Sequence, residues 1–525
     1  MMNELNQEIN RRRTFGIISH PDAGKTTLTE KLLLFGGAIQ VAGAIKAKKA
    51  SKHATSDFME IEKQRGISVA TSVMGFYYND YKINILDTPG HKDFSEDTYR
   101  TLTAVDSAIM VLDSTKGVEG QTHKLMEVCR MRNTPIMTFI NKLDRDGKDP
   151  IELLDEIEDK LQIQVRPMSW PIGMGKSFKG VYSLLEKRIF LFKPHAKQDS
   201  QSIEINNLND PLLDELLDDQ ANQLRDDIEL ISGVYPSFNA DDYLTGLTTP
   251  VFFGSALNNF GVRELLDCFI QYSPPPQSRK TETGTISVDE PTFSGFVFKI
   301  HANMDPKHRD RIAFLRICSG IFERGKKCLN VRTGKSLKFS TPTAFMAQEK
   351  SIIEKAYPGD IIGLHDTGNI KIGDTLTDGK SFLFKGIPNF SPELFRRVVN
   401  LDPLKTKQLT KGLQQLSEEG VAQVFYTITE NKQVLGTVGA LQFDVIQYRL
   451  DKEYRATCRF DTLDYKRACW IRGTTQDIES FISKRKNNIC TDVNGDYVYL
   501  AETQWSLDRE IKENPTLNFR YTSEE

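Results

Sequence analysis

The sequence predicts a multidomain chain: an α/β domain whose parallel sheet is wrapped by helices, then a small antiparallel β-barrel, then a C-terminal α+β domain of split βαβ type. Three observations support this fold class. Strand-like and helical runs alternate in the first half, a proline-rich linker stands at 273–278, and short β-rich runs follow it before strands and helices interleave again. We place the domains at 1–280, with an insertion at about 160–245, at 281–384 and at 385–525.

Length and composition agree with this prediction. A chain of 525 residues is too long for one core, and 39% apolar and 26% charged residues are ordinary for a globular protein. With a net charge of −3, any contact with nucleic acid would rely on local basic patches. Seven scattered cysteines without a Cys-x-x-Cys pair favour reduced thiols. We expect a cytoplasmic monomer without a membrane segment, since no apolar run approaches about 18 residues and the N-terminus is too polar for a secretory signal.

The first loop joins a strand expected at 14–18 to a helix expected at 27–34 and ends in Gly-Lys-Thr. This context favours a phosphate-binding loop, in which backbone N–H groups and the positive helix N-terminus face an anion. Lys25 would reach the β- and γ-phosphates, and the Thr26 hydroxyl would ligate Mg²⁺. A turn that holds no nucleotide is the alternative, because Ser19 stands where the consensus has Gly. The residues expected at the phosphates are Ser19, His20, Pro21, Asp22, Ala23, Gly24, Lys25 and Thr26.

A second Mg²⁺ ligand is expected between a loop and a strand. Residues 38–55 have no clear period and are expected to form a loop, whereas 69–78 are β-rich and are expected to form a strand. Ser68 stands just before that strand, where its hydroxyl could complete the magnesium site. An ordinary polar residue at a strand start is the alternative interpretation.

The next strand, expected at 82–86, ends in the sequence Asp-Thr-Pro-Gly-His. Asp87, at the carboxyl end of this strand, would hold Mg²⁺ through water. Gly90 can bring its N–H close to a γ-phosphate because it has no side chain in the way. His91 follows it directly, so we assign catalysis to His91, Lys25 and Gly90, although a lone histidine is more often structural. The residues of this motif expected at the nucleotide are Asp87, Thr88, Pro89, Gly90 and His91.

The most diagnostic motif follows a strand expected at 135–140, itself preceded by a strand at 108–113 and a helix at 121–130. Guanine presents N1–H and N2–H₂ side by side, and one carboxylate, here Asp144, accepts both. Adenine would instead leave that carboxylate facing a lone pair, which costs more than about 1–3 kcal/mol. Asn141 would tie the base to the phosphate-binding loop. The complete motif is Asn141, Lys142, Leu143 and Asp144, with Lys142 expected along the base plane.

A fourth base contact is expected after a strand at 251–253. The backbone of Ser255 and Ala256 would meet the guanine O6. The long preceding insertion contains an acidic, helical stretch at 208–231, which is either a partner surface or a solvated face. Four motifs in one order at strand ends indicate an α/β P-loop GTPase domain with its ligand at the carboxyl ends of the strands.

The second half of the chain has a different pattern of predicted secondary structure. Short β-rich runs favour an antiparallel barrel, and strands and helices then interleave as in an α+β domain. Basic residues could meet phosphates there, although solvated helix faces explain them as well. The expected barrel strands are 293–300, 313–317, 328–331 and 360–363, followed by helical periods at 391–400 and 405–419, a strand at 421–428 and a helix at 439–450. The basic residues are the cluster 306–311, Arg396, Arg397, Lys405, Lys407, Lys411 and 484–486.

These motifs resemble those of the translational GTPases of the elongation factor G branch, in which a histidine follows Asp-Thr-Pro-Gly. Within that branch the chain is similar to the bacterial peptide chain release factor 3 family, from about residue 10 to near the C-terminus. The segments that carry this likeness are 22–26, 65–68, 87–91, 94–102, 141–144, 302–311, 392–397 and 439–445. The chain departs from the common pattern at two positions. Ser19 stands where Gly is usual, and Ser68 stands where Thr is usual. Nothing corresponds to the last two domains of elongation factor G, which argues against a translocase.

The resemblance implies a ribosome-dependent GTPase of translation termination that promotes dissociation of the stop-codon-reading release factor after peptide release. Water would attack the γ-phosphate of GTP while Lys25, Mg²⁺ and backbone N–H groups stabilise the growing charge. No arginine finger is evident in the phosphate motifs, so hydrolysis should be slow until the ribosome brings His91 into position. Two alternatives stay open: a related ribosomal GTPase in rescue or protection, and a ribosome-binding module whose nucleotide is structural.

Overall fold

The computed structural model describes residues 2–38, 69–191, 201–204, 207–302, 311–346, 349–366, 368–386 and 391–521. The expected magnesium ligand Ser68, most of the loop expected at 38–55 and nearly all of the basic cluster 306–311 lie outside these ranges. No helix within the described ranges combines the length and the apolar character needed to cross a bilayer.

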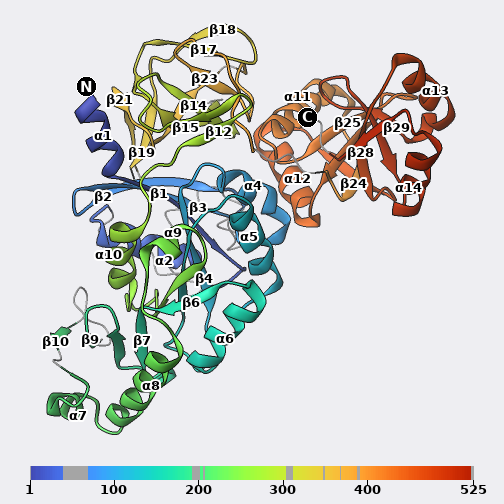
Figure 1. The fold of residues 1–525 in the computed structure, drawn as a ribbon. Coiled ribbons are helices and arrows are strands. Elements are labelled where there is room, and N and C mark those ends of the chain that lie inside the picture. The colour runs from blue at the N-terminus through green and yellow to red at the C-terminus, as the bar shows by residue number, and fades with distance from the viewer. Residues whose placement is uncertain are drawn as a thin grey trace.

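The first half of the chain forms an α/β unit at the centre of Figure 1. Its strands follow the order β2-β3-β1-β4-β5-β11-β6, and β1 pairs in parallel with both β3 and β4. The bounds are β1 Arg12–Ser19, β2 Ser72–Tyr78, β3 Tyr81–Asp87, β4 Ser107–Asp113, β5 Ile136–Asn141, β6 Gln164–Pro167 and β11 Thr248–Phe253. The predicted strands are therefore present, and the carboxyl ends of the parallel strands β3, β1, β4, β5, β11 and β6 share one edge of the sheet.

One strand corrects the prediction of a purely parallel sheet. β2 runs antiparallel to β3, so the sheet is mixed. Asn79 and Asp80 join the two strands with φ of 44° and 63°, and two positive φ values are what a type I′ hairpin turn requires. The Asn-Asp pair was thus a local hairpin signal.

Helices cover both faces of this sheet, as the alternating pattern predicted. Leu28 of α2 and Leu265 of α10 pack with Phe15 of β1 on one face. Leu125 of α5 and Leu153 of α6 pack on the other. The helix bounds are α1 Met2–Asn10, α2 Lys25–Phe35, α4 Ser95–Thr101, α5 Gly120–Met131, α6 Pro150–Leu161, α9 Ala240–Leu244 and α10 Val262–Tyr272. Each side chain of the motifs is thereby held at the sheet edge by a rigid layer beneath it.

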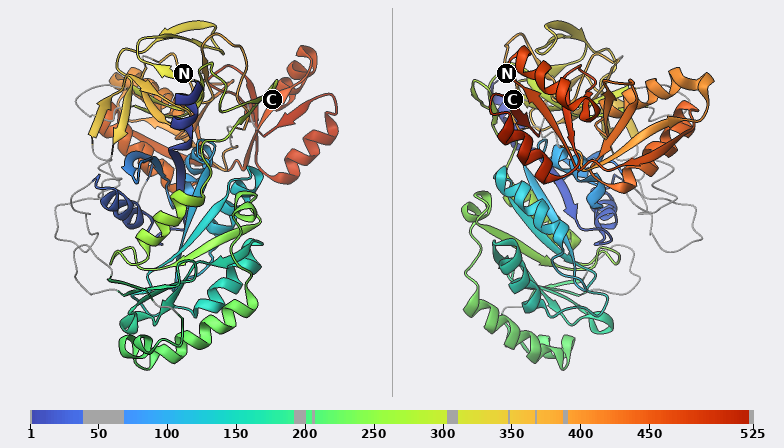
Figure 2. Two further views of the ribbon diagram at one scale, coloured as in Figure 1. Left: turned by 60° about the vertical axis from the view of Figure 1, so that its left-hand side comes forward. Right: turned by 90° about the vertical axis from the view of Figure 1, so that its right-hand side faces the viewer.

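The insertion lies at the end of the molecule opposite the later domains (Figures 1 and 2). It contains the sheet β10-β9-β8-β7, which the sequence did not predict. The single helical stretch expected at 208–231 is two helices, because Asp218 adopts a left-handed φ of 53° between them. The bounds are β7 Ser169–Ile172, β8 Gly180–Ser183, β9 Arg188–Leu191, β10 Gln201–Glu204, α7 Pro211–Leu217 and α8 Gln220–Val234.

The second domain is antiparallel and β-rich, as predicted. Its strands follow the order β18-β17-β23-β14-β15-β22-β19, and β19 continues onto β2 through the pair Met346 and Gly75. The two domains therefore share one continuous sheet. The bounds are β12 Arg279–Thr281, β13 Gly284–Ile286, β14 Ser294–Ala302, β15 Arg311–Ser319, β16 Phe322–Glu323, β17 Lys327–Asn330, β18 Lys335–Lys338, β19 Thr343–Met346, β20 Glu349–Ile352, β21 Lys355–Ala356, β22 Ile361–His365 and β23 Thr375–Thr377.

The C-terminal domain is α+β, and its sheet follows the order β27-β24-β26-β25-β29-β30-β28-β31. The helical period expected at 391–400 is wrong: those residues lead into strand β24, which pairs with β26 and β27 on its two sides. Pairing along both edges outweighs a short helical pattern. The bounds are β24 Leu394–Asn400, α11 Thr406–Glu418, β25 Gln423–Thr427, β26 Gln433–Thr437, α12 Ala440–Tyr454, β27 Cys458–Leu463, β28 Arg467–Arg472, α13 Thr475–Arg485, β29 Ile489–Thr491, β30 Tyr497–Ala501, α14 Gln504–Glu513 and β31 Asn518–Arg520.

Candidate nucleotide site

The loop after β1 has the backbone of an anion cradle. Its positive φ angles fall on Asp22 (66°) and Gly24 (96°), whereas Ser19 is the last residue of β1 and has no such angle. A Cβ on Gly24 would lie 2.3 Å from the Nδ2 of Asn141, so a larger residue would collide with the base motif. Ser19 instead donates its hydroxyl to the carbonyl of His20 at 2.8 Å. The departure at Ser19 is thus harmless, because this turn needs its glycine at 24.

Lys25 and Asp87 meet at the floor of this cradle. The Lys25 side chain is 5% exposed, and its ammonium bonds to Oδ1 of Asp87, which is 1% exposed. The other carboxylate oxygen, Oδ2, is buried and accepts no hydrogen bond in the described part of the chain. A buried anionic oxygen without a partner suits a cation or its water.

This donor set fits magnesium bound together with a nucleotide. Mg²⁺ is commonly held by one or two protein oxygens plus phosphate oxygens and water. The half-buried Thr26 follows Lys25 in the first turn of α2 and supplies a hydroxyl. Among the described residues no group of three or more His, Cys, Asp or Glu side chains forms a metal cluster. Asp87 and Thr26 would therefore hold the ion jointly with the phosphates.

The base end of the site is assembled from two strand ends. Asn141, 3% exposed, donates from Nδ2 to the carbonyl of Ala23 at 2.8 Å and accepts the N–H of Ala256 at Oδ1, also at 2.8 Å. The Ser255 hydroxyl donates to Oδ1 of Asp144 at 2.5 Å. The amide of Asn141 thus joins the loop after β1 to the loop after β11, and its predicted contact with a base stays a prediction. Asp144 is oriented by a neutral hydroxyl, which leaves its charge for a base.

Lys142 is held by a residue that the sequence analysis missed. Its ammonium bonds to the carbonyl of Asp22 and, at 2.7 Å, to Oδ2 of Asp113. Burial acts to raise the pKa of Asp113, but hydrogen bonds from Lys142 and Thr115 outweigh it and lower that pKa. Asp113 ends β4, between β1 and β5, so its place at the shared sheet edge was a usable signal. Leu143 is fully buried and serves packing rather than contact with a base.

His20 lies inside the phosphate-binding loop but is closed off from solvent. Its imidazole is 0% exposed, and neither ring nitrogen makes a hydrogen bond within the described ranges. Burial lowers the pKa of His20, although Glu119, whose Oε2 lies 3.4 Å from Nε2, opposes this in part. The ring is thus enclosed within the loop, while the neighbouring Pro21 is partly exposed.

The Asp-Thr-Pro-Gly-His motif reaches the same edge from β3. Thr88 donates its hydroxyl to the carbonyl of Ile17 at 2.7 Å, and the Pro89 carbonyl accepts the hydroxyl of Thr98 at 3.1 Å. A Cβ on Gly90 would lie 3.5 Å from the backbone of His20, so the motif lies directly against the phosphate-binding loop.

His91 is the partly exposed end of this motif. Its side chain is 34% exposed, and Nδ1 accepts the backbone N–H of Asp93 at 3.3 Å. In the neutral ring the proton therefore sits on Nε2, which is available to a water or a phosphate oxygen.

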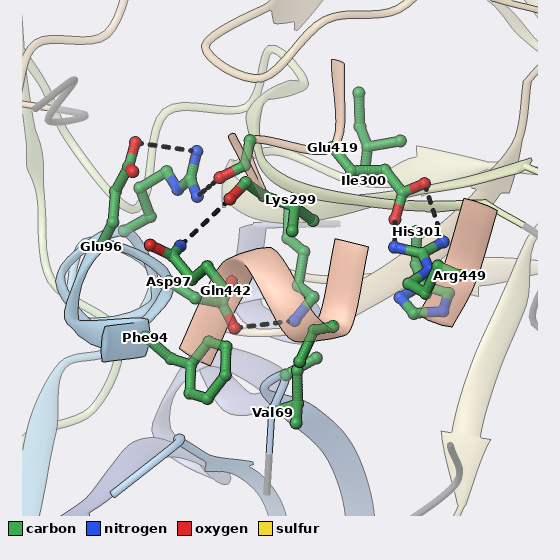
Figure 3. A pocket seen from close by; sticks show the side chains of 15 residues that line it. Val69, Phe94, Glu96, Asp97, Lys299, Ile300, His301, Glu419, Gln442 and Arg449 are labelled. Atoms are coloured by element: carbon green, nitrogen blue, oxygen red, sulfur yellow. Dashed lines mark hydrogen bonds and ion pairs between the residues drawn. The ribbon is translucent and has the colours of Figure 1, made fainter. Parts of the chain in front are cut away.

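A junction of all three domains lies beside these segments (Figure 3). The Lys299 ammonium of β14 donates to the carbonyl of Thr71 at 3.0 Å and to Oδ2 of Asp97 at 2.9 Å. The same carboxylate oxygen accepts the N–H and hydroxyl of Thr71. Across a cavity of about 40 Å³, Arg449 of α12 pairs with Glu419 at 2.9 Å within the C-terminal domain. Arg100 of α4 crosses to that domain and donates to the carbonyl of Gly420 at 2.9 Å. The segments flanking the nucleotide site are thus tied to both later domains.

Comparisons with known proteins agree with this architecture. Residues 10–275, more than half of the chain, match the elongation factor Tu GTP binding domain. Residues 292–379 match elongation factor G domain 2, and residues 384–510 match the C-terminal domain of class II release factor RF3. A crystal structure of a protein from Thermus thermophilus shares the fold with a TM-score of 0.70 at 20% identity, over 89% of this chain and 71% of that chain.

Each match falls on the part of the structure with the corresponding fold. The guanine-nucleotide motifs lie within the first match, and the three matches follow one another without overlap. The chain therefore belongs to the translational GTPases with the elongation factor Tu GTP-binding domain, and it is of the release factor 3 type.

Proposed function

We propose that this GTPase is activated by the ribosome during translation termination and promotes dissociation of the stop-codon-reading release factor after peptide release. The observation that carries the proposal is the combination of a guanine-nucleotide site with a C-terminal domain matching that of class II release factors. We also keep the proposed boundaries 1–280, 281–384 and 385–525, and a monomeric protein acting in the cytoplasm.

The residues at the site support hydrolysis by positioning and electrostatics. Lys25 would face the β- and γ-phosphates after leaving Asp87, and the N–H groups of the loop would point at the same oxygens. Bound Mg²⁺ would neutralise charge on those oxygens, held by Thr26 and, through water, Asp87. Asp144, oriented by the Ser255 hydroxyl, would accept N1–H and N2–H₂ of guanine. A contact of the Ser255 and Ala256 backbone with O6 would require their N–H groups to leave Phe260 and Asn141.

His91 would orient the attacking water. Its Nε2 would donate to that water, but the ring is now turned toward Asp93 by the bond at Nδ1. A partner that moves this segment would complete the site, which explains why hydrolysis should be slow without one. Arg100, in the helix that follows His91, is engaged with the C-terminal domain, where it donates to the carbonyl of Gly420 at 2.9 Å.

Turnover with three kinds of ribosome tests the proposal. We expect GTP hydrolysis to be fastest with terminating complexes that hold a release factor, compared with empty and elongating ribosomes at equal concentration. Dissociation of a labelled release factor should accelerate in parallel. Equal hydrolysis with all three, or hydrolysis without release-factor departure, would favour a related GTPase of rescue or protection. No turnover with any ribosome would favour a structural nucleotide.

A further inference from the structure

Asp93 connects the candidate catalytic segment to the C-terminal domain. Its Oδ2 accepts the backbone N–H of Leu441 at 2.7 Å, in the first turn of α12. The first N–H groups of a helix lack partners within the helix and carry partial positive charge, so a carboxylate from outside stabilises them. Asp93 is 6% exposed, which makes this a buried contact between domains.

The same residue also holds His91. The backbone N–H of Asp93 donates to Nδ1 of the imidazole, and Oδ1 of its carboxylate lies 3.4 Å from that nitrogen. One residue therefore contacts the histidine next to the γ-phosphate position and the end of a helix more than three hundred positions later in the chain. Any displacement of α12 must move or release Asp93.

The contact depends on a glycine at the start of α12. A Cβ on Gly439 would lie 2.1 Å from Cγ and 2.6 Å from Cα of Asp93, so even alanine would push the helix away. Next to this point, Phe94 and Val69, both labelled in Figure 3, pack against Val445 of α12. A small displacement of α12 breaks the hydrogen bond to Asp93 and the apolar contact with Phe94 together. We therefore expect α12 to be either docked or released, with few arrangements in between.

We propose that Asp93 is a positioning residue that makes the orientation of His91 depend on the docking of α12, so that the C-terminal domain regulates the nucleotide site. The proposal rests on the function proposed above and adds the physical link between partner and histidine. Coupling of this kind is reciprocal: the nucleotide state that moves His91 must also loosen or tighten α12.

The decisive test introduces a substitution in the C-terminal domain, across the contact from Asp93, and measures its effect on His91. In the full chain with ¹³C-labelled histidine, the His91 ring signal, identified by its loss in His91→Ala, is compared between wild type, Asp93→Ala and Gly439→Ala. Gly439 is not a partner of His91, yet Gly439→Ala should shift its signal in the same direction as Asp93→Ala. Asp149→Ala, which removes a similar carboxylate cap from Ile151 in α6, should leave it unchanged.

Unmoved signals of the remaining histidines would show that each variant is folded. Asp93→Asn, which can still accept the Leu441 N–H, should restore the signal toward wild type. A His91 signal in Gly439→Ala identical to wild type would overturn the proposal. In ribosome-stimulated hydrolysis, Asp93→Ala and Gly439→Ala should lower kcat about tenfold with GTP affinity nearly unchanged. If wild type is not stimulated, the proposed function fails, whereas the spectra still decide the coupling.

Discussion

Base selection depends on the single carboxylate of Asp144. In Asp144→Asn the amide would offer a donor where guanine also has one, but it would suit the carbonyl that xanthine carries there. Guanine nucleotides should lose on the order of 100-fold in affinity, the value of a charge-assisted bidentate pair, while xanthine nucleotides gain. Competition binding measures the ranking. The exposed neighbour Asp146 supplies a control with the same change of charge, Asp146→Asn, which should leave the ranking of nucleotides unaltered. An unchanged ranking in Asp144→Asn would refute the assignment.

His91 should matter for rate and not for binding. His91→Ala should lower ribosome-stimulated hydrolysis by about 10²–10⁴-fold, the usual contribution of a positioned acid–base group, with GTP affinity little changed. Single-turnover hydrolysis on ribosomes measures the first quantity and equilibrium titration the second. The exposed His123 of α5 provides the control His123→Ala. A full stimulated rate in His91→Ala would remove His91 from the mechanism.

Among single residues, the sequence predicted the positions of those side chains that belong to local motifs. Lys25, Asn141 and Asp144 lie in motifs whose spacing fixes their place at strand ends. Asp93 was missed because it contacts Leu441, far away in sequence, and no local pattern encodes that pairing. Asp113 was missed although its position at the end of β4 was a usable signal. Ser68 lies outside the described residues, so its role stays a prediction.

At the scale of elements, the joint between the first two domains depends on a buried carboxylate. Asp360 is 1% exposed, and its Oδ1 forms ion pairs with Arg12 of β1 at 3.0 Å and with Lys82 of β3 at 2.8 Å. Burial alone would raise the pKa of Asp360, but the two cations outweigh it and hold that pKa well below the usual carboxyl range. The next residue toward the N-terminus, Gly359, accepts from Thr14 through its carbonyl.

Removing this charge should weaken the fold. Asp360→Asn removes the charge that faces the buried Arg12 and the partly buried Lys82, and it should lower the free energy of unfolding by about 3 kcal/mol at neutral pH. A depressed carboxyl pKa stabilises the fold above its unfolded value of about 3.9, and that stabilisation is lost as pH falls toward the lower folded value. The difference between wild type and Asp360→Asn should therefore shrink below about pH 4.

Urea unfolding at about pH 7 and about pH 3.5, on either side of the unfolded carboxyl pKa, measures this difference. Glu354→Gln supplies the matched control, because Glu354 pairs with Arg324 at 2.7 Å but is 75% exposed, and it should leave the midpoint unchanged. A difference that persists undiminished at the lower pH would contradict the role given to the Asp360 charge.

Elements with strong local signals were predicted, and those defined by pairing were not. β1, α2, β5 and α12 follow from apolar periods and flanking motifs. Strand β24 was predicted to be helical because its local pattern does not show its pairing with two strands that lie later in the chain. The small sheet of the insertion was missed for the same reason, since its four-residue strands, such as β8, carry little periodicity.

At the scale of the whole molecule, the three domains meet beside the candidate nucleotide site. The second domain extends the sheet of the first, and the C-terminal domain contacts the segments that flank the phosphates through Asp93 and Arg100. The order of the domains was predicted from the proline-rich linker and from the changes in secondary-structure pattern along the chain. Their contacts did not, because Lys299, Thr71 and Asp97 come together only in three dimensions (Figure 3).

All of these functions presuppose that the edge of the central sheet binds guanine nucleotides. Isothermal titration calorimetry of the purified chain in Mg²⁺ buffer, with GTP, GDP and ATP in separate titrations, tests this most directly. We predict saturable binding of GTP and GDP at one site per chain and no measurable heat with ATP at the same concentrations. Equal affinity for GTP and ATP, or no binding of either guanine nucleotide, would contradict the account.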